Sequence, residues 1–401
     1  VRYGKLENGL TYYIRQNQQP KQRAEFYIAQ NVGAILENDD QNGLAHFLEH
    51  MAFNGTKNFP DKMIIEYFEK IGVKFGSNIN AYTSLDETVY NLSDVPTVRE
   101  SVIDSALLVL HDWSGFISLL GEEIDSERGV IREEWRTGAG PERRMWKASN
   151  YLKYPGSQYA KRDVIGDTAV INNFSHETLR AFYRKWYRPD LQAILIVGDV
   201  DVDQVEAKIK TMFADISAKE NAGERPVYPI LDNKEPIISI VKDKEARMTR
   251  IELEYKHEVM PDEIKPTMAG YMTGLLNSVV STIMGYRFEE ITQQADAPFV
   301  AGFAEYGELV KSKDAFQLLA IPKEGLEQQG LKALLLEAEK MKRFGFTNAE
   351  VERAKTDILK SLENAYNDRE NQRNRDLVRE YVRHFLDGEV IPGIEWEYQT
   401  A

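Results

Sequence analysis

The chain contains two stretches in which the predicted secondary-structure elements follow one order: strand, strand, helix, helix, strand, strand, helix, helix. Strands are predicted where β-branched and aromatic residues gather between turn residues, and helices where apolar residues recur every three or four positions. The two copies share almost no sequence. Their common order therefore predicts an α+β fold of two similar modules, each a mainly antiparallel sheet with helices packed on one face.

The predicted elements of the first copy are strands 10–15 and 24–32, helices 43–53 and 61–71, strands 74–83 and 87–92, and helices 98–113 and 122–137. Those of the second copy are strands 236–241 and 250–257, helices 267–287 and 288–294, strands 299–306 and 315–321, and helices 326–343 and 348–366. Between the copies we predict a helix at 178–186, a strand buried on both faces at 193–197 and a helix at 202–213.

The segment 217–236 differs from its surroundings, because it combines Pro226, Pro229, Pro236 and Gly223 with many charges and little periodicity. Such composition is typical of a connection between domains. We therefore predict a first module over residues 1–220, a linker at 221–235, a second module at 236–387 and a non-helical tail at 388–401.

Composition excludes several classes of function. Lys and Arg total 50 against 64 Asp and Glu, a net charge of −14 that argues against a general nucleic-acid binder. No apolar run approaches the ~18–20 residues of a membrane span. The chain has no cysteine, so any transition metal must be held by its 6 histidines and by carboxylates.

The segment H-F-L-E-H places His46, Glu49 and His50 within one short stretch of a predicted helix. The two histidines are four residues apart, so they lie on one helix face, where both imidazoles can bind one ion. Glu49 borders that face and can accept a proton from a water whose pKa zinc lowers toward ~7. The alternative is a histidine pair in an apolar core, but polar groups there need partners. The pentad therefore predicts a Zn²⁺ site with Glu49 as the catalytic base.

This pentad inverts the H-E-x-x-H order of other zinc peptidases, and the chain resembles the pitrilysin, insulysin and mitochondrial processing peptidase family of zinc metallopeptidases. The likeness is carried by G-L-A-H-F-L-E-H-M-A-F-N-G-T (43–56), N-A-Y-T (80–83), D-E-T-V-Y (86–90), E-R-G-V-I-R-E-E (127–134), W-Y-R-P-D (186–190) and V-G-D (197–199). Residues 236–401 resemble the family's second module only in element order and length. The resemblance implies a pitrilysin-type half clamshell.

The resemblance also implies the third zinc ligand. In the family pattern the glutamate seven residues after the E-R pair binds the metal, which is Glu134 here, and the earlier one, Glu127, supports a histidine ligand. The spacing in the sequence favours Glu127 as the ligand instead. Glu134 follows His50 by 84 residues, which exceeds the family's usual gap, whereas Glu127 follows it by 77, which fits that gap better. Glu133 is adjacent and is a further alternative.

A substrate-binding strand is implied at Asn80, Ala81 and Tyr82, which resemble the edge strand that pairs with the peptide backbone in this family. Main-chain hydrogen bonds to an extended peptide give affinity without demanding a particular sequence. The alternative is an internal strand. Phe53 and Tyr82 are candidates for lining a side-chain pocket, with core packing equally compatible.

We therefore expect a zinc-dependent endopeptidase that cleaves extended or unfolded peptides. The resemblance implies that the chain is the N-terminal catalytic half of a longer protease, with residues 388–401 beginning a linker to the C-terminal half, or that it pairs with a second family subunit. The alternative function is a non-catalytic or structural-zinc subunit. We expect a location in the bacterial periplasm or cell envelope, with the cytoplasm as the alternative, since a chain without cysteine suits both.

Overall fold

The computed structural model describes residues 1–219 and 222–401, which form two compact units. The first unit comprises Val1–Tyr228 and Asn371–Ile391, and the second comprises Pro229–Glu370 and Pro392–Ala401. The predicted boundary between residues 220 and 221 lies outside the described residues. Among the described residues no helix is long and apolar enough to span a membrane.

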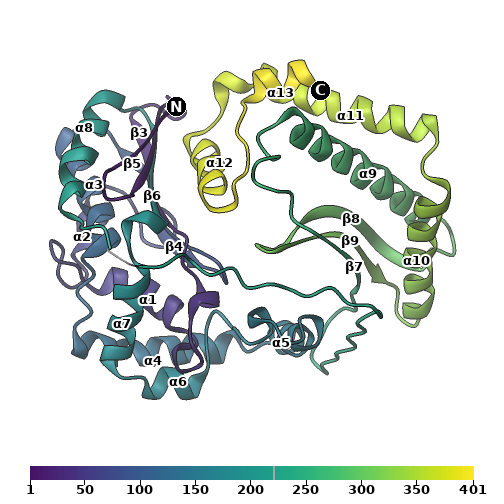
Figure 1. The fold of residues 1–401 in the computed structure, drawn as a ribbon, viewed down its shortest axis with the longest axis horizontal. Coiled ribbons are helices and arrows are strands. Elements are labelled where there is room, and N and C mark those ends of the chain that lie inside the picture. The colour runs from purple at the N-terminus through teal and green to yellow at the C-terminus, as the bar shows by residue number, and fades with distance from the viewer. Residues whose placement is uncertain (220–221) are drawn as a thin grey trace. The chain divides into compact units, whose positions relative to one another are not determined.

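The first unit combines one sheet with many helices (Figure 1). Its strands are β1 (Arg2–Lys5), β2 (Thr11–Gln16), β3 (Arg23–Gln30), β4 (Ile79–Thr83), β5 (Thr88–Pro96) and β6 (Gln192–Gly198). Its helices are α1 (Leu44–Asn54), α2 (Met63–Lys70), α3 (Glu100–Gly115), α4 (Gly121–Gly138), α5 (Pro141–Lys153), α6 (Thr168–Asn173), α7 (His176–Trp186), α8 (Val202–Met212) and α12 (Asn374–Asp387). Helices α5 and α6 were not predicted, because apolar residues do not recur with a clear helical period in either segment.

The first sheet has the strand order β1-β2-β6-β3-β5-β4, with only β2 and β6 running parallel. Every residue of β6 is buried, as the apolar run at 193–197 predicts. The reason is that helices cover the sheet on both sides: α3 packs against β3 and β5 on one face, and α12 packs against β3 and β6 on the other. The strand β4 remains at the edge.

Helix α12 differs from the sequence-based expectation, which assigned residues 371–387 to the second module. Its buried side chains include Leu377, Val378 and Tyr381, and they share one apolar cluster with Tyr13 and Tyr27 of the first sheet. At the start of the helix, the backbone N–H of Asn374 donates to the carbonyl of Gln19, at 2.7 Å. The helix is therefore part of the first unit, and it covers the sheet face that the other helices leave bare.

The second unit contains β7 (Ile251–His257), β8 (Phe299–Val310), β9 (Lys313–Pro322), α9 (Met268–Thr292), α10 (Glu327–Phe344), α11 (Asn348–Asn367) and α13 (Ile394–Thr400). Its antiparallel sheet has the order β7-β9-β8, which repeats the order β3-β5-β4 of the first unit. Helix α9 connects β7 to β8 as α1 and α2 connect β3 to β4. The duplicated order predicted from the sequence is therefore visible in the strand pairing.

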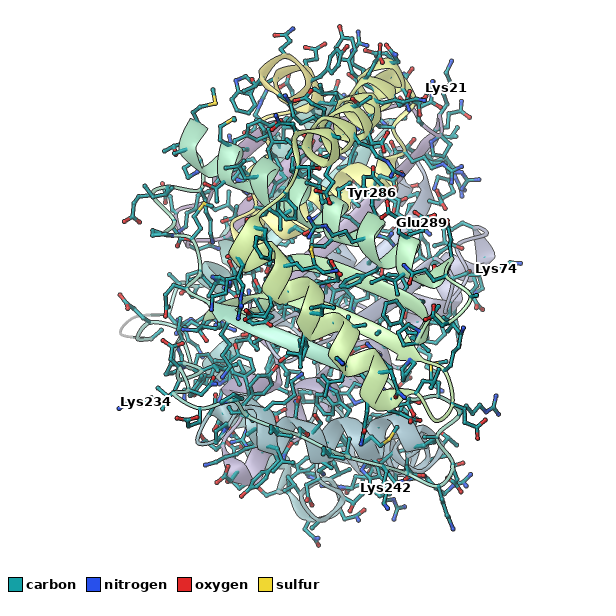
Figure 2. The ribbon with its side chains drawn as sticks, turned by 90° about the vertical axis from the view of Figure 1, so that its right-hand side faces the viewer. Lys21, Lys74, Lys234, Lys242, Tyr286 and Glu289 are labelled. Atoms are coloured by element: carbon teal, nitrogen blue, oxygen red, sulfur yellow. The ribbon has the colours of Figure 1, made fainter. Side chains whose placement is uncertain are left out.

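The helices of the second unit are tied to one another by polar and aromatic contacts. Tyr286 of α9, labelled in Figure 2, donates a hydrogen bond to Asp357 of α11. The guanidinium of Arg353, also on α11, lies 3.9 Å from the centre of the Tyr286 ring. Helix α10 packs on the sheet through Leu334 and Ala338, and Figure 2 shows it in front of the strands.

Three predictions for the second copy were wrong. Residues 236–241 form no strand, and Ile238 and Ile240 are 75% and 86% exposed. The two helices predicted at 267–287 and 288–294 are one continuous helix, α9. The predicted non-helical tail contains α13, whose Trp396 packs on the ring of Tyr271 at 4.7 Å.

Candidate metal centre

Helix α1 places the two histidines of the pentad side by side. It starts after Gly43, whose φ of 105° is in the left-handed region that favours glycine. Its apolar residues, including Phe47 and Leu48, are fully buried. The packing fixes the helix and turns the opposite face toward α4, so that the rings of His46 and His50 lie 4.7 Å apart between their centres.

Helix α4 brings Glu134 to these two imidazoles. The Nε2 atom of His46 lies 3.7 Å from Oε1 of Glu134, and the Nε2 atom of His50 lies 3.4 Å from its Oε2. These distances exceed ordinary N–H···O hydrogen bonds. An ion bound tetrahedrally at ~2.0–2.2 Å would hold such atoms ~3.4 Å apart. One ligand atom from each of the three residues lies within 4.8 Å of the others, so this donor set fits a zinc ion.

Glu127 lies behind His50 rather than among the three grouped residues. Its Oε1 is 2.8 Å from Nδ1 of His50, and its Oε2 accepts a hydrogen bond from the side-chain amide of Asn54 at 2.5 Å. A carboxylate on one ring nitrogen orients the imidazole and leaves the other nitrogen for a metal. Glu133, the residue before Glu134, instead forms an ion pair with Arg136 through two hydrogen bonds of 2.6 and 2.9 Å.

The two histidines have different electrostatic environments. Burial and the neighbouring His50 lower the pKa of His46 to about 4, which keeps that ring neutral, as a metal ligand must be. Burial acts against protonation of His50 too, but the hydrogen bond to Glu127 and the nearby carboxylate of Glu134 outweigh it and raise its pKa to about 9. The neighbouring His50 holds the pKa of the Glu134 carboxyl below its ordinary value.

Glu49 lies next to the three grouped residues without belonging to them. It is buried, and burial raises the pKa of its carboxyl. The hydroxyl of Thr83, the last residue of β4, donates a hydrogen bond to its Oε2 at 2.5 Å. This bond engages Oε2 of Glu49 and not Oε1. The hydrogen bond between Thr83 and Glu49 thus connects the edge strand β4 to the H-F-L-E-H segment of α1.

The strand β4 offers backbone groups on its free edge. Both backbone groups of Ile79 bond to the preceding loop, with the N–H donating to Lys74 at 3.0 Å and the carbonyl accepting from Gly76 at 2.9 Å. Alternate residues of a strand point their backbone groups to opposite sides. The N–H and C=O of Ala81 therefore face the free edge, where the N–H meets only the side chain of Asn80, at 2.9 Å.

The aromatic residues of the predicted pocket differ in their surroundings. Tyr82 is 46% exposed, and its hydroxyl donates to Glu87 at 2.9 Å. Phe53 is packed in an aromatic cluster, with ring centres 5.5 Å from Trp113 and 5.6 Å from the exposed Phe75. A role for either residue in substrate binding stays a prediction.

Two residues of the site escaped the sequence-based reasoning. Both Asn54 and Thr83 lie within the motifs that carry the family resemblance, but neither residue type is diagnostic of a metal site. Only their positions pointed to the site: Asn54 lies one helical turn after His50, and Thr83 ends the predicted edge strand.

Comparison with known proteins identifies the family. The profile described as "Insulinase (Peptidase family M16)" matches residues 12–139, and the one described as "Peptidase M16 inactive domain" matches residues 173–358. The chain belongs to peptidase family M16. The pentad lies within the first match, and α9, which occupies the place of α1 in the second copy, has no histidine. The resemblance inferred from the motifs is confirmed.

Two of the relatives that this M16 chain matches are named as zinc proteases. It is 32% identical to "Zinc protease PQQL-like" of Arabidopsis thaliana over 99% of this chain and 38% of that protein. It is 31% identical to "Probable zinc protease PqqL" of Escherichia coli over 93% of this chain and 39% of that protein. The chain thus spans well under half the length of these relatives. The crystal structure of the first half of periplasmic PqqL from Escherichia coli aligns with a TM-score of 0.89 and 28% identity, covering 100% of this chain and 84% of that one.

The geometry predicts different effects for the glutamates of α4. Glu134→Gln should weaken zinc binding severely, because it removes the charged ligand atom. Glu127→Gln should weaken it within the ~10–100-fold typical of residues that orient a ligand. Glu133→Gln on the same helix is the control and should leave the zinc dissociation constant unchanged. Competition with a chromogenic chelator measures all three, and a larger effect at Glu127 than at Glu134 would contradict the assignment.

Proposed function

We propose that this M16 chain is the zinc-binding catalytic half of a metalloendopeptidase that cleaves extended or unfolded peptides. One observation carries the proposal: Glu49 lies beside the group formed by His46, His50 and Glu134, and its side chain is tied to an edge strand. The candidate base, the candidate metal ligands and the strand edge that could bind an extended peptide are therefore neighbours.

In the proposed mechanism, His46, His50 and Glu134 hold Zn²⁺, which when bound supplies a Lewis acid for water and for the scissile carbonyl. Glu49 accepts a proton from the attacking water and returns it to the departing amine. The hydrogen bond from Thr83 holds one oxygen of Glu49, so that the other is directed to this transfer. Glu127, which accepts a hydrogen bond from the amide of Asn54, orients His50 through its Nδ1 atom.

The proposed substrate binds along the free edge of β4. A peptide added to this edge would pair with the outward N–H and C=O of Ala81 and displace the side chain of Asn80 from that N–H. Only an extended segment can make such bonds, so folded proteins would have to present a loop or an unfolded region. Backbone recognition also implies a broad sequence preference.

A structural zinc site is the alternative, and the donor set argues against it. Structural zinc usually has four protein ligands, whereas a catalytic zinc has three and an open position. Among the described residues, three side chains form the group. Glu49 is close by but is held by Thr83. A non-catalytic subunit would have no need of an intact pentad.

We further propose that this chain is the N-terminal half of a longer protease located in the bacterial periplasm. The support is its alignment with the first half of a periplasmic protease and its coverage of 38–39% of its relatives. A second family subunit in place of a covalently joined half is the alternative.

The test is to assay the 401-residue chain alone and with a candidate C-terminal half supplied as a separate chain. We expect zinc binding in both cases. Cleavage of an unstructured fluorogenic peptide should be poor for the chain alone and rise by at least ~10²-fold on addition, because correct placement of substrate supplies much of the rate. Light scattering during the assay reports oligomers. Full activity from a strictly monomeric chain would show that no second half is needed.

A further inference from the structure

A buried carboxylate upstream of α1 has no role in the mechanism above. Glu37 follows the short 3₁₀ helix Ala34–Leu36, and only 1% of it is exposed. Its Oε2 accepts the backbone N–H of Gly43 at 2.9 Å, and its Oε1 accepts that of Ala45 at 2.7 Å. Both donors belong to the start of the helix that carries the pentad.

These bonds replace a cap that the local sequence cannot provide. The first N–H groups of a helix have no partner within the helix, and a Ser, Thr, Asp or Asn at the N-cap position usually accepts one of them. Here the N-cap is Gly43, which has no side chain. Glu37 therefore caps α1 from six residues upstream, with one carboxyl oxygen at each of two backbone N–H groups of the helix start.

The cap acts on the turn that contains a proposed zinc ligand. His46 directly follows Ala45, whose N–H Glu37 holds. The Nδ1 atom of His46 is buried without a hydrogen-bond partner, so no carboxylate orients this ring as Glu127 orients His50. The direction of its Nε2 atom toward Glu134 therefore depends on the backbone of the first turn.

Glu37 is itself firmly held. Its backbone carbonyl accepts hydrogen bonds from Nε of the buried Arg162 at 3.0 Å and from the amide of Gln158 at 3.1 Å. The same loop approaches α1 closely, because a Cβ added to Gly43 would lie 2.7 Å from the Cα of Gly166. Burial raises the pKa of the Glu37 carboxyl to about 8, and the two N–H donors and Arg162 act against that rise.

We propose that Glu37 is a positioning residue of the metal centre, which sets zinc affinity by fixing the first turn of α1 and with it His46. The proposal rests on the zinc site proposed above. It predicts that damage to the cap weakens zinc binding through His46, beyond any general loss of stability.

The test compares Glu37→Gln with Glu25→Gln. Glu25 is a matched control, because it is also 1% exposed and also accepts a backbone N–H, that of Asp94 at 3.2 Å, but it lies on β3 away from α1. Both variants should melt at lower temperature than the parent in the metal-free state. Only Glu37→Gln should weaken zinc, by at least ~10-fold. In the cobalt-substituted protein, its visible absorption spectrum should differ from that of the parent.

Glu37→Asp keeps the carboxyl group with a shorter reach and should recover part of the affinity. It also serves as the test variant if Glu37→Gln does not fold. If the parent binds zinc and folded Glu37 variants bind it equally well, with an unchanged cobalt spectrum, the positioning role is wrong and the zinc site stands. If the parent itself binds no zinc, the site and the positioning role both fall.

Discussion

Glu49→Gln in the complete two-half protease is expected to retain zinc and lose peptide cleavage by at least the ~10²–10⁴-fold that general acid–base help contributes. The amide has nearly the shape of the carboxylate and still accepts a hydrogen bond from Thr83, but it cannot take a proton from water. Because Glu49 is not among the three grouped residues, the metal content should stay at the parental level. Single-turnover rates and zinc analysis on the same sample separate the two effects.

The control for this variant is Glu122→Gln, an exposed glutamate in the first turn of α4. It changes the net charge by the same amount and should cleave at the parental rate. A Glu49→Gln enzyme that cleaves as fast as the parent would show that another group is the base. Loss of zinc from this variant would show that Glu49 is a ligand instead.

His50→Ala is expected to abolish zinc binding at micromolar metal, and cleavage with it. The change removes one of the three donors, and it also leaves the buried Glu127 without its 2.8 Å partner. A buried carboxylate that loses a hydrogen-bond partner adds a stability cost. His176→Ala is the control, because His176 pairs with the exposed Asp125 at 2.9 Å outside the metal centre. Retention of about one zinc per chain in His50→Ala would contradict the ligand set.

Local patterns were enough to predict much of the fold. The four-residue spacing of His46 and His50 follows from helix geometry alone, and the apolar run at 193–197 indicated a strand buried on both faces. The helix predicted at 178–186 is α7, which begins where the side chain of Ser175 accepts the N–H of Thr178 at 3.1 Å. These features depend on neighbours in sequence, so one sequence reveals them.

Features that depend on distant contacts could not be predicted. The apolar stripe of α12 shows that one face is buried, but nothing in residues 374–387 indicates that it packs on the sheet of the first unit. Residues 236–241 have the composition of a strand, yet the structure assigns no strand to them. Helix α13 depends on aromatic contacts with α9 and α11.

In the candidate site too, local spacing predicts some features and only the packing of distant segments decides the others. Glu127 and Glu134 are seven residues apart, so helix periodicity places both on one face of α4 and cannot rank them. The packing of α4 against α1 distinguishes them, with Glu134 at both Nε2 atoms and Glu127 at Nδ1 of His50. Glu37 escaped notice because capping rules consider the residue at the helix start, and here the cap comes from six residues upstream.

The most direct test of the central claim is zinc-dependent cleavage by the chelator-stripped two-half protease. Rate is measured on an unstructured peptide while zinc is added back, with bound metal determined in each sample. We predict that the stripped enzyme is inactive and that activity returns in proportion to bound zinc, reaching its maximum at about one ion per catalytic half. Parental activity without bound metal, or zinc binding that restores no cleavage, would contradict the assignment of this chain as the catalytic half.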